Sequence, residues 1–259
     1  AILDKIKNLG NFKFSDQEVA QGIVAAPDKC FLEKDLSVYS PEEKNYLKKY
    51  FTASGRYRSA NSKNYIFYIS DKNFHNKNID DFPNIKIHFE PFKAVLHDAK
   101  KKYGTPDKPY FYLHRERDVR FFESGPKIVC GVRVSEPSFF YTEDEYYGSR
   151  ALNFIRTERV NLKYLVGILN SKVSYFWLKN RGKQLGDLMQ IDKGPLLEVP
   201  LFIGLDDQQK QIIEIVNRIT DIKKQEPEAN TKNLENQIDE LVMDLYNLNE
   251  NEKKIIRNS

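Results

Sequence analysis

The sequence predicts an α/β fold of the α+β kind: a mixed, curved β-sheet with packed helices and a C-terminal helical hairpin. Three observations predict it. Short runs rich in β-branched and aromatic residues recur between residues 65 and 155, as expected of strands. Apolar residues at three- and four-residue spacing over residues 162–179 are typical of a largely buried helix. Two apolar stripes near the C-terminus indicate paired helices.

The N-terminal part predicts a strand followed by a turn and a helix. Residues 21–26 form an apolar run that leads into a turn at Pro27 and Asp28. Ser40, Pro41 and Glu43 occupy the N-cap, first and third positions expected at a helix start. The apolar residues that then recur on one face of this predicted helix are Tyr46, Leu47, Tyr50 and Phe51.

The middle of the chain predicts most of the strands. Residues 65–69, 110–113, 127–134, 138–141 and 152–155 are short and β-rich, and we expect them to form one curved sheet that is mostly antiparallel or mixed. A helix is expected from about residue 89 to residue 103. Gly104 would end it in the left-handed conformation, with Pro106 beyond.

The C-terminal part predicts mainly helices. Asn161 would cap one helix over residues 162–179, and a polar loop with glycine follows over 180–193. Residues 197–203 indicate another strand, in which Pro200 suggests either an edge position or a bend.

Two apolar stripes, interrupted near Pro227, then indicate an antiparallel hairpin, and Asn249 with Glu252 caps a last short helix. The stripes are Ile212, Val216 and Ile219, then Leu234, Ile238, Leu241, Leu245 and Leu248. We therefore expect one domain over residues 1–204, and a helical hairpin with a short final helix over 205–259.

Composition narrows the function class. With 40% hydrophobic and 30% charged residues the chain is neither disordered nor fibrous, and its net charge of +4 permits a polyanionic partner. Cys30 and Cys130 lie far apart in apolar surroundings, which predicts buried thiols in a reducing cytoplasm. The sequence has no apolar run of membrane-spanning length and no leader pattern, and it begins at Ala1 without Met, so we expect a piece of a longer protein.

Catalytic motifs are missing from the sequence. An adenine methyltransferase would need a glycine-rich cofactor loop and an Asn/Asp-Pro-Pro-aromatic tetrapeptide, and neither occurs. The same holds for a phosphate-binding Walker loop, a Gly-x-Ser-x-Gly elbow and a His-Glu-x-x-His helix. The histidines are scattered, at His75, His88, His97 and His114. We therefore predict no catalytic residue, no metal ligand and no cofactor within this domain.

A Mg²⁺-dependent nuclease is the alternative from another class. Asp28, with Glu42 and Lys44 further on, superficially matches the Pro-Asp and acidic-x-Lys pattern that binds Mg²⁺. In that chemistry the acidic-x-Lys segment lies on a strand. Here Glu42 and Lys44 fall in the first turn of a predicted helix, where carboxylates simply favour the helix dipole.

Binding chemistry concentrates in loops with cations, amides and hydroxyls. Such side chains contact phosphates and read base edges, although solvated turns and salt bridges explain the same compositions. A fourth loop, at residues 141–150, adds Arg150 beside three acidic residues. The predicted DNA-binding residues are Arg56, Tyr57, Arg58, Ser59, Asn61 and Lys63 in the first loop, His114, Arg115, Arg117 and Arg120 in the second, Arg181, Lys183, Gln184 and Lys193 in the third, and Arg150.

The order of these segments resembles the C-terminal specificity domain of TaqI-like DNA adenine-N6 methyltransferases and type IIG restriction-modification enzymes. The matching pieces cover most of the chain in the right order. They are residues 21–24, 50–57, 65–68, 115–129, 164–172, 197–201, 211–216 and 241–256, which include the Leu169-Asn170-Ser171 triplet and the Val199-Pro200 pair.

The resemblance implies a division of labour. A separate methyltransferase or nuclease domain would bind S-adenosylmethionine, and Mg²⁺ if the parent also cleaves DNA. Residues 1–204 would be the DNA target-recognition domain, which docks in the major groove of duplex DNA and selects the site. The helical tail over 205–259 would pack on it or on the catalytic domain. Leu169, Asn170 and Ser171 would be structural. Two further alternatives stay open: a fragment of a type I-like specificity subunit that pairs with separate methylating subunits, and a protein-interaction module built on the helical tail.

Overall fold

The computed structural model describes residues 2–259 and confirms the predicted fold class, because short strands form several open sheets with helices packed around them. The strands are β1 (Val19–Gln21), β2 (Leu32–Glu33), β3 (Leu47–Phe51), β4 (Ser54–Gly55), β5 (Arg58–Ser59), β6 (Asn64–Phe67), β7 (Lys127–Gly131), β8 (Arg133–Val134), β9 (Phe139–Thr142), β10 (Tyr147–Gly148), β11 (Leu152–Ile155), β12 (Lys183–Leu185) and β13 (Leu188–Gln190).

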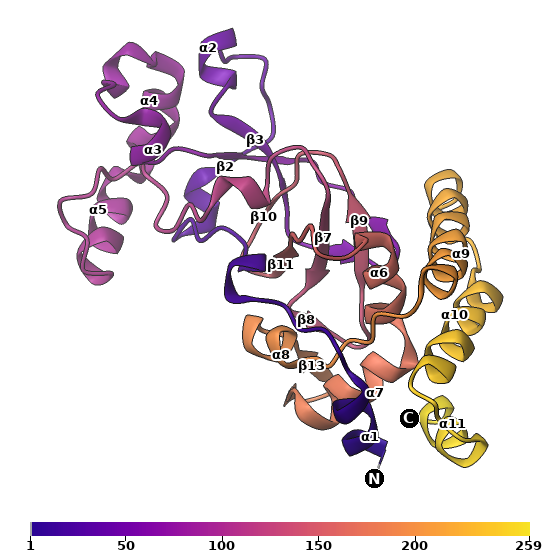
Figure 1. The fold of residues 1–259 in the computed structure, drawn as a ribbon. Coiled ribbons are helices and arrows are strands. Elements are labelled where there is room, and N and C mark those ends of the chain that lie inside the picture. Colours follow the sequence, from indigo (N-terminus) through magenta and orange to yellow (C-terminus); the bar gives the residue numbers. More distant parts are fainter. Residues whose placement is uncertain (1) are drawn as a thin grey trace.

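The helices lie on several sides of the sheets (Figure 1). They are α1 (Ile2–Leu9), α2 (Pro41–Lys44), α3 (Asp71–Phe74), α4 (Pro83–Phe89), α5 (Lys93–Lys102), α6 (Leu162–Asn170), α7 (Lys172–Arg181), α8 (Lys193–Glu198), α9 (Asp206–Gln225), α10 (Lys232–Leu245) and α11 (Glu250–Arg257). In Figure 1, α3, α4 and α5 stand at one extremity and α9, α10 and α11 line the opposite side.

The sheet with strand order β1-β11-β7-β9 separates two hydrophobic cores. Successive side chains of a strand point to opposite faces. Ile128 and Cys130 of β7 accordingly join the core under α6, α7, α9 and α10, whereas Val129 joins the core of the β3 and β6 sheet. Because both faces are covered, every residue of β7 is buried. Cys30 and Cys130 are buried free thiols, as predicted.

The prediction of one continuous sheet is wrong. A second sheet has the order β10-β3-β6-β2, a third has β12-β13-β8, and β4 pairs with β5 alone. The first sheet contributes side chains to both cores, whereas β3 and β6 of the second sheet contribute to only one of them. The strand predicted over residues 21–26 is also displaced. β1 precedes it and shares only Gln21 with it, and single bridges join Ile23 to Ser149 and Val24 to Arg115.

The helix predicted after Ser40 is real but only one turn long. Ser40 and Glu43 form the predicted capping box, yet the chain then enters β3, where Tyr50 pairs with Asn64. Aromatic residues favour a strand once a partner strand is available, and that tertiary pairing overrides the helical spacing. Residues 110–113 form turns instead of the predicted strand, and they are mostly buried as core side chains. Short apolar runs do not distinguish these cases.

The predictions for residues 161–203 need three corrections. Asn161 caps α6 as predicted, but Ser171 adopts ψ 158° and divides the expected helix into α6 and α7. The expected polar loop contains the hairpin β12–β13, which turns at Gly186 with φ +61°. Residues 193–198 form α8, and the expected strand is reduced to a bridge between Leu201 and Phe12.

Of the helix predicted over residues 89–103, α5 forms the part over 93–102, whereas residues 90–92 form a 3-10 turn and Phe89 ends α4. The other helix predictions are confirmed. Gly104 lies beyond α5 with φ +68°, and α9 and α10 form the expected hairpin around Pro227. Asn249 and Glu252 form the capping box of α11. Within residues 2–259, no helix has the length and apolar character to cross a membrane. The division into residues 1–204 and 205–259 stays a prediction.

Candidate nucleic-acid interface

The second and fourth predicted loops meet at the segment that follows β1. Val24 and Arg115 exchange backbone hydrogen bonds, and Arg150 donates its backbone N–H to the Ile23 carbonyl at 2.9 Å. Gly22 permits this approach, since a Cβ there would lie 2.0 Å from the Ser149 carbonyl oxygen. The fold thus brings arginines that lie 35 positions apart in the sequence to the two sides of one short segment.

A first hollow of about 290 Å³ lies beside β1 and collects cations from distant segments. Arg117, Arg120 and Lys193 line it together with Gln21 and the carboxylates Asp16 and Asp118. Lys193 pairs with Asp16 at 2.9 Å, and Arg120 pairs with Asp118 at 2.7 Å. These pairs are partly or fully exposed, so they hold the cations in place at little energetic cost and leave them accessible to an anion.

Arg117 adopts φ +66°, a left-handed conformation that is uncommon for a residue with a side chain. Its Nε donates to the Gly22 carbonyl at 3.1 Å. Burial, and then the neighbouring charge of Arg115, lowers the pKa of Arg117, but an arginine stays protonated at neutral pH. The left-handed turn therefore aims a fixed cation at the end of β1.

A second hollow of about 450 Å³ adjoins the first, and Gln21 lines both. Its other polar walls are Arg133, Arg150, Gln190 and Asp192. In the described chain, the guanidinium groups of Arg133 and Arg150 form no ion pair or hydrogen bond. We call Arg117, Arg120, Arg133, Arg150 and Lys193, with Gln21 between them, the basic face.

Sequence reasoning missed three residues of these hollows. Arg133, Gln21 and Gln190 were not among the predicted binding residues, although all three are of types that read base edges. Their sequence neighbours are apolar strand residues, so composition did not mark them as a loop cluster. Arg133 could have been found from the sequence, because its charged side chain stands between Val132 and Val134 in an otherwise apolar run.

The first predicted loop lies elsewhere, against the helical tail. Arg56 bonds to the Glu235 carboxylate and to the carbonyls of Pro137 and Asn170, each at 2.7 Å. Arg58 pairs with Glu228 at 2.6 Å, and Tyr57 is only 2% exposed. These contacts give Arg56 and Tyr57 a structural role, and their contact with DNA stays an untested prediction.

The remaining predicted residues are spread over three places. Ser59 donates to the Ala60 carbonyl, while Asn61 and Lys63 are exposed in the loop before β6. His114 packs against Tyr103, and burial followed by the charge of Arg115 lowers its pKa, so the ring is neutral at pH 7. Arg181, Lys183 and Gln184 are exposed around the start of β12.

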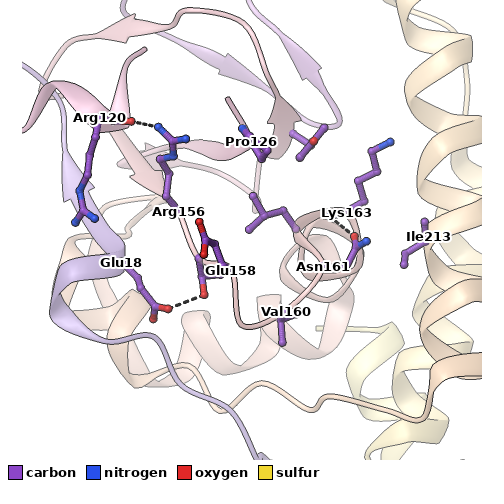
Figure 2. A pocket seen from close by; sticks show the side chains of 12 residues that line it. Glu18, Arg120, Pro126, Arg156, Glu158, Val160, Asn161, Lys163 and Ile213 are labelled. Carbon is purple, nitrogen blue, oxygen red and sulfur yellow. Dashed lines mark hydrogen bonds between the residues drawn. The ribbon is translucent and has the colours of Figure 1, made fainter. Parts of the chain in front are cut away.

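A third and larger hollow, of about 940 Å³, lies at the start of α6 (Figure 2). Figure 2 shows Arg120 and Arg156 on one side of it and Lys163 beside Ile213 on the other. At its rim, Glu18 accepts hydrogen bonds from Thr157 and Arg159, and the Arg159 bond is the largest cause that lowers the pKa of Glu18 to about 2. Arg120 lines both this hollow and the basic face.

The acidic-x-Lys segment of the nuclease alternative forms a helix and helps to hold the fold together. Glu42 and Lys44 belong to α2, and the Glu43 carboxylate between them accepts from the backbone of Asn84 and Ile85. Among residues 2–259, no three His, Cys, Asp or Glu side chains are arranged to hold a metal ion.

Two curated relatives match much of the chain. The type II methyltransferase M.HindII of Haemophilus influenzae is 26% identical over 218 residues, which are 79% of this chain and 41% of the relative. The type II methyltransferase M.HincII of Haemophilus influenzae is 27% identical over 163 residues, which are 60% of this chain and 32% of that relative. The chain therefore spans less than half the length of either relative.

A solved structure shares the fold. The type IIL restriction-modification enzyme MmeI, determined in complex with DNA, superposes with a TM-score of 0.66 at 12% identity, covering 93% of this chain and 36% of that chain. In addition, a family model described as the TaqI-like C-terminal specificity domain matches residues 55–201. Since that match covers more than half of the chain, the protein belongs to this family, the specificity domains of restriction-modification enzymes.

Proposed function

We propose that this chain is a sequence-specific DNA-binding domain that positions duplex DNA for adenine-N6 methylation, cleavage, or both, by a separate domain. The observation that carries the proposal is the basic face, where five cations from four segments surround two adjoining hollows. Clustered cations attract the phosphate backbone, and Gln21 and Gln190 between them suit base edges.

The comparisons support this proposal. Both curated relatives are type II methyltransferases, and the structural neighbour was solved with DNA bound. We propose that the catalytic part is a methyltransferase or nuclease domain of the same chain, as the greater length of the relatives suggests, or otherwise a partner subunit. In this proposal S-adenosylmethionine, and Mg²⁺ where cleavage occurs, bind that part, this domain holds no cofactor, and the whole acts in the cytoplasm.

Binding should depend on salt and on individual cations of the basic face. We expect Arg150→Ala and Lys193→Ala to weaken binding to duplexes of any sequence and each to reduce the slope of log K against log salt by about 1. Fluorescence anisotropy of a labelled duplex with a randomised centre, titrated at several salt concentrations, measures both effects.

Arg218→Ala is the matched control, because this exposed arginine lies on α9 outside both hollows. It should leave affinity and slope unchanged. Salt-independent binding, or equal behaviour of all three variants, would reject the basic face as the DNA surface. A lack of any binding by the unaltered protein would instead favour the protein-interaction alternative.

A further inference from the structure

The hairpin β12–β13 projects from the domain with one side uncovered. Every residue of β12 is exposed, and Met189, which is 3% exposed, is the one residue of β13 that is buried. The hairpin joins the body through β8, where Met189 pairs with Val134 and Gln190 pairs with Arg133. Its turn places Gly186 at the first central position, as a tight type II′ hairpin turn requires.

The register of the hairpin decides which side chains share a face. Directly opposite residues of paired strands point the same way. Gln184 is opposite the buried Met189, so these two belong to the inner face. The outer face carries the row Lys183, Gln190 and Arg133 across three strands, and the pair Leu185 and Leu188 beyond it. We call these five residues the reading face.

The stability of the fold does not explain why Leu185 and Leu188 are exposed. Leu185 and Leu188 are 49% and 38% exposed, opposite each other at the end of the hairpin, where burying them would stabilise the domain. An exposed apolar pair rimmed by polar residues is typical of a contact surface. Gln190 and Arg133 from the next row also line the hollow that holds Arg150, so the reading face is continuous with the basic face.

We propose that the hairpin β12–β13 enters the major groove and that its reading face selects the DNA sequence. This inference rests on the proposed function, and it assigns the selection of the DNA sequence to one element, the hairpin. A two-stranded ribbon fits the major groove, which is about 12 Å wide. The other cations of the basic face, which are Arg117, Arg120, Arg150 and Lys193, then contact the phosphates on either side.

The side chains of the reading face suit base edges better than phosphates. Arg133 can donate two hydrogen bonds to guanine, Gln190 can bond adenine in bidentate fashion, and the leucine pair can contact thymine methyl groups. Asp187 at the tip would be repelled by a phosphate but can accept from a cytosine amino group. Asp192 accepts from Gln190 at 2.7 Å and pairs with Lys183 at 3.7 Å, which makes it a positioning residue for this row.

Selection from a pool of duplexes with a randomised centre tests the inference. The unaltered protein should enrich a defined sequence. The Leu185→Ser/Leu188→Ser variant and Gln190→Ala should each lose preference at one or more base positions by roughly 10-fold. Their affinity for the unselected pool and their salt slope should stay within about twofold, because no phosphate contact is removed.

The double variant Leu205→Ser/Ile222→Ser is the matched control, since it removes two exposed apolar side chains from the region of α9. It should enrich the same sequence as the unaltered protein. Circular dichroism confirms that all variants are folded, which is expected because the altered side chains are exposed or half exposed.

Three results would overturn the inference while leaving the proposed function standing. The hairpin variants could enrich the original sequence at full strength, or the control variant could lose the preference as well. The hairpin variants could also lose affinity for all duplexes equally with a reduced salt slope, which would make the hairpin a phosphate clamp. If the unaltered protein bound no duplex, the proposed function itself would fail, and an apolar contact to another protein would explain the leucines.

Discussion

At the residue scale, Arg56 is bound at three points and has little freedom to serve a ligand. Its side chain is 17% exposed and its partner Glu235 is 12% exposed. Although burial opposes ionisation of Glu235, the charge of Arg56 keeps the pKa of that carboxyl below its usual range. Removing one partner of such a pair leaves a buried charge uncompensated, which costs more than the pair contributes.

We therefore expect Arg56→Met to lower the free energy of unfolding by about 3 kcal/mol and the double variant Arg56→Met/Glu235→Leu to recover at least half of that loss. Urea unfolding of the unaltered protein, the two single variants and the double variant measures these changes in the free energy of unfolding. Arg58→Ala, which breaks an exposed pair with Glu228, is the control and should cost less than about 1 kcal/mol. Additive losses in the double variant would contradict the structural role of Arg56.

Glu18 predicts a pH dependence of stability. Its pKa falls from 4.5 to about 2 on folding, first because Arg159 donates hydrogen bonds to the carboxylate. Because the pKa of Glu18 is lower in the folded than in the unfolded protein, its ionised carboxylate stabilises the fold above pH 4.5. This stabilisation is lost as the pH falls through about 2. Because Arg159 is half exposed, water screens the pair and we expect only about 1 kcal/mol.

The measurement compares Glu18→Gln with the unaltered protein by urea unfolding at several pH values. The difference in free energy of unfolding should be full at pH 6 and shrink as pH falls from 4.5 towards 2. A difference that does not change with pH would show that Glu18 acts through its hydrogen-bonding shape and not through its charge.

At the element scale, Asn170 joins the end of α6 to the edge of a sheet. Its side chain accepts from the Phe139 N–H at 2.9 Å and donates to the Phe139 carbonyl at 2.8 Å, as a neighbouring strand would. Ser171 then turns the chain, and Asp239 of α10 accepts the Lys172 N–H at 2.8 Å. The Leu169-Asn170-Ser171 triplet therefore has the structural role that the family resemblance implies.

Asn170→Ala should lower the free energy of unfolding by about 2 kcal/mol, because the buried Phe139 N–H loses its acceptor and the Phe139 carbonyl keeps the Tyr57 N–H but loses the Asn170 amide. Thermal unfolding followed by circular dichroism measures the loss. Asn61→Ala, at an exposed asparagine in the loop before β6, is the control and should change stability by less than about 0.5 kcal/mol. Equal effects of both variants would contradict the bridging role.

At the scale of the whole molecule, the helical tail completes the core on one side of the central sheet. Ile212 and Val216 of α9 pack directly over Gly167 of α6, where a Cβ would lie 2.5 Å from the Ile212 side chain. The two helices approach this closely because position 167 has no side chain. The tail and the preceding residues therefore share one hydrophobic core in the described chain.

Gly167→Ala should consequently lower the free energy of unfolding by about 1 kcal/mol, although alanine favours helices more than glycine does. Gly194→Ala in α8 is the matched control, since a Cβ there meets no atom within 4 Å, and it should be neutral or slightly stabilising. Urea unfolding of both variants gives the comparison. A stabilised Gly167→Ala would mean that α9 is not held against α6.

The sequence by itself determined the features that depend on neighbouring residues. The caps at Ser40, Asn161 and Asn249, the left-handed Gly104 and the two-helix tail all follow from local hydrogen bonding or helical spacing. The family resemblance was also readable, because it lies in the order of segments.

Only the tertiary structure decided which segments became strands and which cations share a face. Residues 47–51 become a strand because β6 supplies partners, and Arg56 turns towards Glu235, 179 positions away. The basic face joins four arginines and Lys193 from four segments around Gln21. Pairing and burial between distant residues outweigh local propensity by several kcal/mol, and a linear sequence does not display those distances.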